Sequence, residues 1–173
     1  MTQKPQQNDI NIRAMEPEDL DALYSIENDQ RLWGVSTTNV PYSRYTLHDY
    51  IANSAGDIYT DRQVRLIIET ADKDIVGILD LVNFDPRHLR AEVGIVIQEP
   101  YRCQGYALTA LSRLKAYAQH VLHLHQLYAI VEASHIPAVS LFRKAGYEPS
   151  ATLHDWLFDG TEYHDSLLLQ LLL

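Results

Sequence analysis

Cysteine is almost absent from this sequence. Cys103 is the only one in 173 residues, so the chain cannot form an internal disulfide, and a reducing compartment suits it. No apolar run reaches the length of a transmembrane helix, and the polar first residues, MTQKPQQND, hold no signal-peptide core. The apolar final residues, SLLLQLLL, are too few to span a bilayer and are typical of a buried strand. We therefore expect a cytoplasmic protein with no membrane partner.

Basic residues are also few. The chain has 14 Lys and Arg against 23 Asp and Glu, which gives a formal net charge of −9. Nucleic-acid binding depends on clustered Lys and Arg, so we expect no nucleic-acid partner, and a cationic acceptor suits the acidic total better. The length predicts a single domain, over residues 8–173, and the polar residues 1–7 are expected to form a disordered or flexible N-terminus.

Two phosphate-binding motifs are missing. No Lys-Ser or Lys-Thr follows Gly105, so the P-loop pattern GxxxxGK[ST] is absent, and a single glycine cannot satisfy the dinucleotide pattern GxGxxG. Nucleotide hydrolysis and hydride transfer therefore lose support.

The run from residue 90 to residue 122 nevertheless predicts an anion site. EVGIVI, residues 92–97, predicts a strand that ends before Pro100, and apolar residues at spacings of three and four predict a helix from about residue 105 to 122. Its predicted buried stripe is Ala107, Leu111, Leu114, Ala118 and Val121. The loop between strand and helix would present free backbone N–H groups at the positive end of the helix.

Two blocks of this sequence resemble a known family. Arg102, Gly105 and Ala107 fit the pattern [Q/R]-x-x-G-x-[G/A]. After a strand over residues 126–131, residues 135–147 are similar to N-x-x-[A/S]-x-x-L-[Y/F]-x-K-x-G-[F/Y]. In this order and one helix apart, the blocks resemble the GNAT superfamily of N-acetyltransferases, nearest to the bacterial spermidine and ribosomal-protein N-terminal acetyltransferases.

The remaining elements complete the fold that the resemblance implies. The patterns predict strands over residues 8–14, 64–70 and 75–84, a final hairpin of strands over residues 153–158 and 163–173, and helices over residues 17–26, 43–53 and 138–145. Residues 27–42 are expected to form a substrate-side loop. The resemblance implies an α/β (α+β) fold with a mixed, mostly antiparallel twisted sheet of about seven strands, helices on both faces, and parallel splayed central strands that bind CoA.

The resemblance also implies acetyl-CoA as co-substrate and no metal. The implied cofactor-binding residues are strand residues Ile95, Val96 and Ile97, loop residues Arg102, Cys103, Gln104, Gly105, Tyr106, Ala107 and Leu108, and second-block residues His135, Ala138, Phe142 and Lys144. Two of these depart from the family pattern: His135 stands where Asn is common, and Phe142 stands where many members carry Tyr.

Direct acetyl transfer in a ternary complex needs a base for the amine and a proton donor for the thiolate. We expect Glu92 to be the base. For the donor we name Tyr147 and leave Ser140, Tyr163 or a water open, since Phe142 has no proton to give. A nucleophilic Cys103 is not needed for direct transfer, and the three histidines His120, His123 and His125 lie at a helix end and are not expected to bind zinc.

The acceptor is expected to be a primary amine: a polyamine such as spermidine, another small amine, or a protein N-terminus. Its expected contacts are Glu27, Asp29, Trp33 and Asp80, with Asp85 and Asp155 as further carboxylates. The departures at Phe142 and His135 leave one alternative open, a non-catalytic acyl-CoA-binding module. A homodimer or a higher homo-oligomer is also open.

Overall fold

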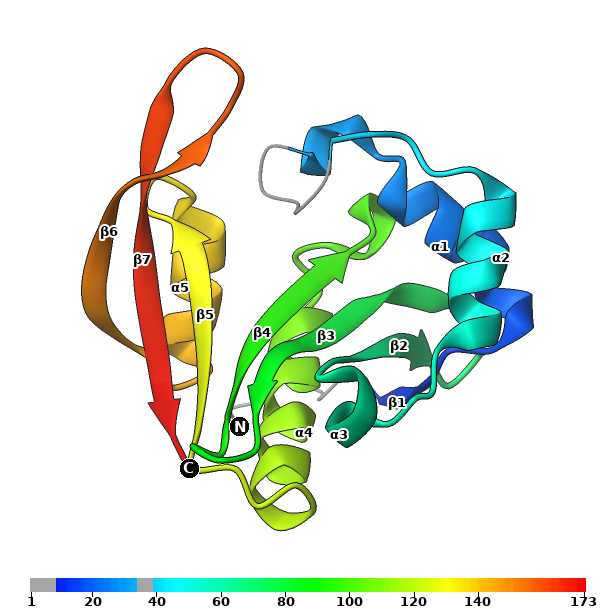
Figure 1. Ribbon diagram of the computed structural model, residues 1–173, viewed down its shortest axis with the longest axis horizontal. Coiled ribbons are helices and arrows are strands. Elements are labelled where there is room, and N and C mark those ends of the chain that lie inside the picture. Colours follow the sequence, from blue (N-terminus) through cyan, green and yellow to red (C-terminus); the bar gives the residue numbers. More distant parts are fainter. Residues whose placement is uncertain (1–8, 34–38) are drawn as a thin grey trace, which may run out of the picture.

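Seven strands form one mixed sheet in the computed structural model, which describes residues 9–33 and 39–173 (Figure 1). The sheet order is β1-β2-β3-β4-β5-β7-β6, and every neighbouring pair is antiparallel except β4 and β5, which are parallel. The bounds are β1 Ile10–Ala14, β2 Val64–Thr70, β3 Ile75–Asp85, β4 Arg90–Ile97, β5 Gln126–Glu132, β6 Glu148–Phe158 and β7 Tyr163–Leu172. This confirms the predicted sheet. The flexible N-terminus predicted for residues 1–7 lies outside the described residues.

Helices cover both faces of the sheet. α1 (Leu20–Glu27) and α2 (Arg44–Asn53) lie on one face, where the buried cluster contains Ile26, Ile67 and Ile78. α4 (Tyr106–His120) and α5 (Ile136–Lys144) lie on the other face, over the larger cluster. The predicted N-cap of α2 is confirmed, because the Ser43 hydroxyl accepts a hydrogen bond from the Thr46 N–H at 3.0 Å.

Two predicted boundaries need correction, and some short elements were not predicted. β6 begins at Glu148 and not at residue 153, because an edge strand that is mostly exposed has no apolar alternation to mark it. The helix α3 (Ile58–Asp61) was not predicted, because its four residues make little more than one turn and cannot show a repeating apolar stripe. Val121 is exposed because α4 ends one residue before it. The 3-10 turn Pro17–Asp19 lies inside the helix predicted over residues 17–26, and the turn Gln30–Leu32 lies in the predicted loop over residues 27–42, where a short helical turn was considered. The 3-10 turn Glu99–Tyr101 was not predicted.

The sheet opens in its middle, as predicted. β4 and β5 share only the pairs Arg90–Gln126, Ala91–Leu127 and Glu92–Tyr128. β4 stays paired with β3 up to Ile97, and β5 stays paired with β7 up to Glu132. The facing edges beyond Glu92 and Tyr128 therefore have no ladder partner within the described residues, and the two strands diverge (Figure 1). We call this opening the split, with its apex at the Glu92–Tyr128 pair.

Candidate active site

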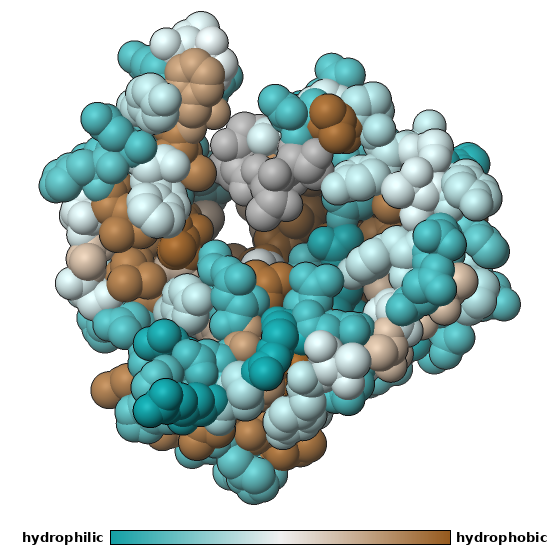
Figure 2. All heavy atoms as spheres, in the orientation of Figure 1, coloured by the Kyte–Doolittle hydropathy of each residue, from teal (hydrophilic) through white to brown (hydrophobic). Residues whose placement is uncertain are grey.

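The walls of the split are strand edges, which present backbone N–H and C=O groups to a ligand. Ile95 and Ile97 pack their side chains against the larger cluster, and Val96 packs against the smaller one on the opposite face. The residues expected to meet the acetyl group thus offer their backbone and not their side chains. Figure 2 shows the surface hollowed between the β6–β7 side of the molecule and the α1–α2 side. An extended acyl carrier arm fits such an edge because it can replace the missing ladder partner.

The β4 wall depends on a close approach by β3. A Cβ atom added at Gly77 would lie 2.1 Å from the Val96 carbonyl oxygen and 3.1 Å from the Ile97 Cα. At Gly94, two residues nearer the apex than Val96, the same atom would lie 3.6 Å from the Asp80 Cβ, which is ordinary contact. Only Gly77 therefore has to be a glycine for β4 to lie where it does.

The loop from β4 to α4 has the backbone shape of an anion site. Cys103 and Gly105 adopt left-handed conformations, with φ of 60° and 89°. The Arg102 Nε donates a hydrogen bond to the Ile97 carbonyl at 2.9 Å, and the Gln104 side chain donates one to the Pro100 carbonyl at 2.8 Å. These bonds hold the loop against the end of β4.

The first turn of α4 supplies the donors. Gly105 is the N-cap and provides no side-chain cap, and the helix's main-chain bonds begin with the Thr109 N–H, which donates to the Gly105 carbonyl at 3.1 Å. The N–H groups of residues 106–108 therefore have no partner within the helix and point out of its positive end. This arrangement fits a pyrophosphate, as expected for the loop residues Arg102 to Leu108.

The second block begins with a cap that explains the unusual histidine. His135 is the N-cap of α5, and its Nδ1 accepts a hydrogen bond from the Ala138 N–H at 3.1 Å. The imidazole thus does at this position what the Asn side chain of other members can do, so the departure from the family pattern leaves the helix start intact. Ala138 itself is half-buried against the larger cluster.

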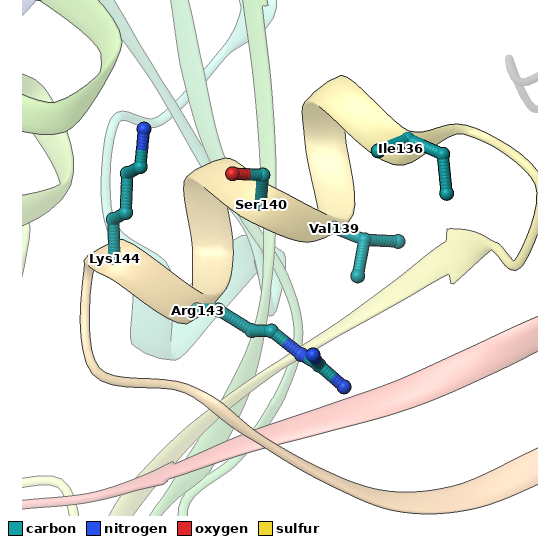
Figure 3. A pocket seen from close by; sticks show the side chains of 5 residues that line it. All are labelled: Ile136, Val139, Ser140, Arg143 and Lys144. Atoms are coloured by element: carbon teal, nitrogen blue, oxygen red, sulfur yellow. The ribbon is translucent and has the colours of Figure 1, made fainter.

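A pocket lies along α5. It has a volume of about 410 Å³, and Ile136, Val139, Ser140, Arg143 and Lys144 line it (Figure 3). Ser140 and Lys144 project on one side of the helix and Val139 and Arg143 on the other. Lys144, an expected cofactor contact, is exposed and makes no ion pair among the described residues.

Tyr147 does not lie where a proton donor is needed. It is 1% exposed, its ring packs edge-on against Phe142 at 5.0 Å between centroids, and its hydroxyl has no hydrogen-bond partner in the described chain. Burial raises the pKa of the hydroxyl. Core side chains enclose the group, so it has no path to a thiolate outside the core. Phe142, an expected cofactor contact, is buried in the same core.

Glu92 lies at the apex of the split, where the sequence placed the base. A β-bulge in β3 turns Asn83, at φ of 50°, so that its amide donates a hydrogen bond to the Glu92 carboxylate at 2.8 Å. Tyr128 is the ladder partner of Glu92 on β5, and burial and then the negative charge of Glu92 raise the pKa of its hydroxyl. Neither Asn83 nor Tyr128 was predicted from the sequence to belong to the site. The expected parallel pairing of β4 with β5 was the one signal that could have placed Tyr128 beside Glu92.

The structure brings two of the expected acceptor contacts together, but around a cation. Arg65 on β2 binds both oxygens of Asp80 at 2.8 Å and also pairs with Glu27 of α1. Asp80 pairs with Gly94, which lies two residues from Glu92 along β4, so this triad and Glu92 belong to the same sheet face. Two carboxylates against one guanidinium leave a net charge of −1, and an incoming ammonium group has to compete with Arg65.

The other two expected contacts are used differently. Asp29 caps the Gln30–Leu32 turn and forms an ion pair with the Arg31 guanidinium. The hydrogen bond from Arg31 lowers the pKa of the Asp29 carboxyl. Arg31 also forms an ion pair with Glu99, which lies just before the loop that leads into α4. The Trp33 indole N–H donates to the Glu27 carbonyl at 3.1 Å. Asp29 is thus tied to the cofactor side, and Trp33 fixes the end of α1.

The histidines of residues 120–125 form no metal-binding group with other described side chains. The one such group in the described part of the chain is Asp159, Glu162 and His164, in the turn between β6 and β7. The Asp159 carboxylate there accepts hydrogen bonds from the backbone N–H groups of residue 161 at 2.7 Å and Glu162 at 2.9 Å, and it is hydrogen-bonded to the His164 ring at 2.7 Å. These are the bonds of a closed turn. No helix within the described ranges is long and apolar enough to cross a membrane.

Comparisons with known proteins agree with this geometry. The model of the acetyltransferase (GNAT) domain matches residues 9–148. A spermidine N(1)-acetyltransferase of Vibrio cholerae is 25% identical over 156 residues, covering 90% of this chain and 88% of the relative. The crystal structure of spermidine N-acetyltransferase from Vibrio cholerae in complex with CoA and spermine has a TM-score of 0.85 at 24% identity, covering 94% of this chain and 95% of that chain. A dodecameric structure of that enzyme has a TM-score of 0.79 at 26% identity, covering 94% and 93%.

Proposed function

Because the chain belongs to the acetyltransferase (GNAT) family, we propose that it transfers the acetyl group of acetyl-CoA directly to a primary amine of a polyamine such as spermidine. Family membership and the likeness to spermidine N-acetyltransferases confirm the fold, the co-substrate and the enzyme class expected from the sequence, an acetyl-CoA-dependent N-acetyltransferase. The observation that carries the proposal is the split, which runs from Glu92 at its apex to the open first turn of α4 at its mouth.

The chain's own groups define how the co-substrate lies. The pyrophosphate binds the N–H groups of residues 106–108 and the Arg102 side of the loop, and the pantetheine arm follows the unpaired edge of β4 toward the apex. The acetyl carbonyl then meets a backbone N–H among Ile95, Val96 and Ile97, which stabilises the negative charge that develops on the oxygen during transfer. Cys103 shapes the loop through its left-handed backbone and takes no part in the chemistry.

Glu92 is the base of this proposal. The amine nitrogen attacks only in its neutral form, and the Glu92 carboxylate accepts the proton that nitrogen gives up as the new C–N bond forms. The Asn83 amide holds the carboxylate in place at the apex, 2.8 Å away. The role therefore rests on position: Glu92 is the carboxylate at the point where the two strands part.

The acceptor face supports a cationic substrate. Glu92 and the triad of Glu27, Arg65 and Asp80 share one face of the sheet, and their summed formal charge is −2. An extended diamine or triamine can place one nitrogen at Glu92 and a second ammonium group beside the triad. We propose in addition that the protein self-associates, since a related spermidine N-acetyltransferase forms a dodecamer.

Release of free thiol from acetyl-CoA tests the function. We expect turnover with spermidine that exceeds turnover with small monoamines and with short peptides bearing a free N-terminus. Glu92→Gln should reduce kcat about 10²–10⁴-fold, the range for a lost general base, with acetyl-CoA affinity unchanged. Glu162→Gln, at the exposed turn between β6 and β7, is the matched control and should keep full activity. Tight acetyl-CoA binding without thiol release from any amine would favour the non-catalytic acyl-CoA-binding module instead.

A further inference from the structure

We infer that Tyr128 on β5 is the acid that protonates the CoA thiolate as it leaves. This assignment rests on the proposed function and adds a residue to the same site. It answers the question raised by Phe142, which occupies the usual tyrosine position and is buried in the core.

Register places the Tyr128 side chain at the reaction centre. Tyr128 is opposite Glu92 in the last pair of the parallel β4–β5 ladder, so both side chains lie on the same face of the sheet and flank the apex of the split. Tyr128 is half-buried and is not among the residues of the buried core. The negative charge of Glu92 is close enough to raise the pKa of the Tyr128 hydroxyl, after the larger effect of burial.

The other hydroxyls considered for this role lie elsewhere. Tyr147 is enclosed by the core. Ser140 lies on α5, where it lines the pocket along that helix (Figure 3). Tyr163 lies at the start of β7 beside the turn, where it is 62% exposed and packs on Phe158 at 4.9 Å between ring centroids. None of the three lies on β4 or β5, whereas Tyr128 is the ladder partner of Glu92 at the apex.

Glu92 and Tyr128 together can account for the proton transfers that accompany acetyl transfer. The bound ammonium group first loses one proton to water, and the neutral amine attacks the thioester carbon. As the C–N bond forms, Glu92 takes a second proton from nitrogen. The C–S bond breaks with its electron pair on sulfur, and the Tyr128 hydroxyl gives its proton to that sulfur. Glu92 then returns its proton to the phenolate oxygen, so the products are the amide, the free thiol and one proton in solvent, and both residues regain their starting forms.

The charges around Tyr128 determine at which step its hydroxyl can give up its proton. Burial raises the pKa of Tyr128 above its ordinary value of 10.0, and the negative charge of Glu92 raises the pKa further. Of the other neighbouring charges, Arg90 lowers the pKa and Asp85 raises it. Tyr128 therefore keeps its proton in the resting protein. Once Glu92 has taken the proton of the amine, its negative charge is gone, and the phenol becomes a stronger acid at the step in which the thiolate forms.

Replacing the hydroxyl alone tests the assignment. Tyr128→Phe keeps the ring, and we expect kcat to fall about 10²–10⁴-fold, as for other lost general acids, while the affinity for acetyl-CoA in calorimetry stays within twofold. Tyr117→Phe, on the exposed face of α4, is the matched control and should stay within twofold in both. If Tyr128→Phe turns over within twofold of the unchanged protein, Tyr128 is not the acid. If the unchanged protein releases no thiol with any amine, the proposed function itself fails, and the assignment fails with it.

A titration followed by NMR separates acid catalysis from simple packing. Labelling tyrosine with ¹³C at Cζ gives the pKa of Tyr128, whose signal is identified by its loss in Tyr128→Phe. The pKa should be lower in Glu92→Gln than in the unchanged protein, because the neighbouring negative charge is gone. An unchanged pKa would mean that the two side chains are not coupled, which overturns the timing described above.

Discussion

Gly77→Ala is the sharpest test of how the sheet shapes the active site. The new Cβ would lie 2.1 Å from the Val96 carbonyl oxygen, whereas carbon–oxygen contacts in sheets lie at about 3.3–3.6 Å. β3 and β4 must therefore separate by about 1.2 Å or more at this point, along the part of β4 expected to hold the acetyl carbonyl. Overpacking of this kind costs about 1–3 kcal/mol, which in a domain of this size lowers Tm by about 2–12 °C.

The functional loss should exceed the loss of stability. A misplacement of about 1 Å in a catalytic group costs on the order of 10²-fold in rate, so we expect kcat to fall by that factor at a temperature where the variant is fully folded. Gly94→Ala is the matched control for stability, because its Cβ meets Asp80 at 3.6 Å, and Tm should change by only a few degrees. Calorimetric unfolding and thiol release on both variants provide the comparison. A Gly77→Ala protein with unchanged Tm and unchanged kcat would refute the argument.

Two further predictions concern the cofactor loop and acid stability. Gly105→Val should weaken acetyl-CoA binding, measured by calorimetry, far more than Gly160→Val. Both variants replace a glycine with a left-handed backbone, but only Gly105 is the N-cap of α4. Equal affinities of the two variants would contradict the loop assignment. Hydrogen bonds from Lys73 and then from Arg13 lower the pKa of the Glu69 carboxyl from 4.5 to about 2. A lowered pKa in the folded state means that this stabilisation is present above pH 4.5 and is lost as the pH falls toward about 2. The urea midpoint should therefore fall more steeply below pH 4.5 in the unchanged protein than in Glu69→Gln, and parallel curves would exclude the linkage.

Local sequence patterns predicted most of the fold, because in most segments the spacing of apolar residues matches the helix or strand that the segment forms. The strand and helix over residues 90–120 have clear periods of two and 3.6, and the glycine between them marks the turn. α3 and the first half of β6 escaped prediction for a physical reason: a four-residue helix has too few turns to show a stripe, and an exposed edge strand has no buried face.

The site was predictable only in part, because its side chains meet across the fold. The loop residues act through their backbone, which a motif can specify. Arg65, by contrast, lies 38 residues from Glu27 and 15 from Asp80, and only the sheet register and the position of α1 bring the three together. Tyr147 looked suitable as a free hydroxyl in the second block, yet the chain direction after α5 points it into the core.

The three ladder pairs between β4 and β5 make the co-substrate part of the architecture. Within the sheet, the halves β1–β4 and β5–β6–β7 are joined only at the closed end of the split, and the packing of α4 against α5 adds the main connection between the helices. A ligand that hydrogen-bonds along both free edges ties these halves together, so the folded state gains the free energy of binding. At a concentration 100 times its Kd that gain is about 2.7 kcal/mol. Acetyl-CoA supply would then set how long the chain survives proteolysis as well as how fast it works.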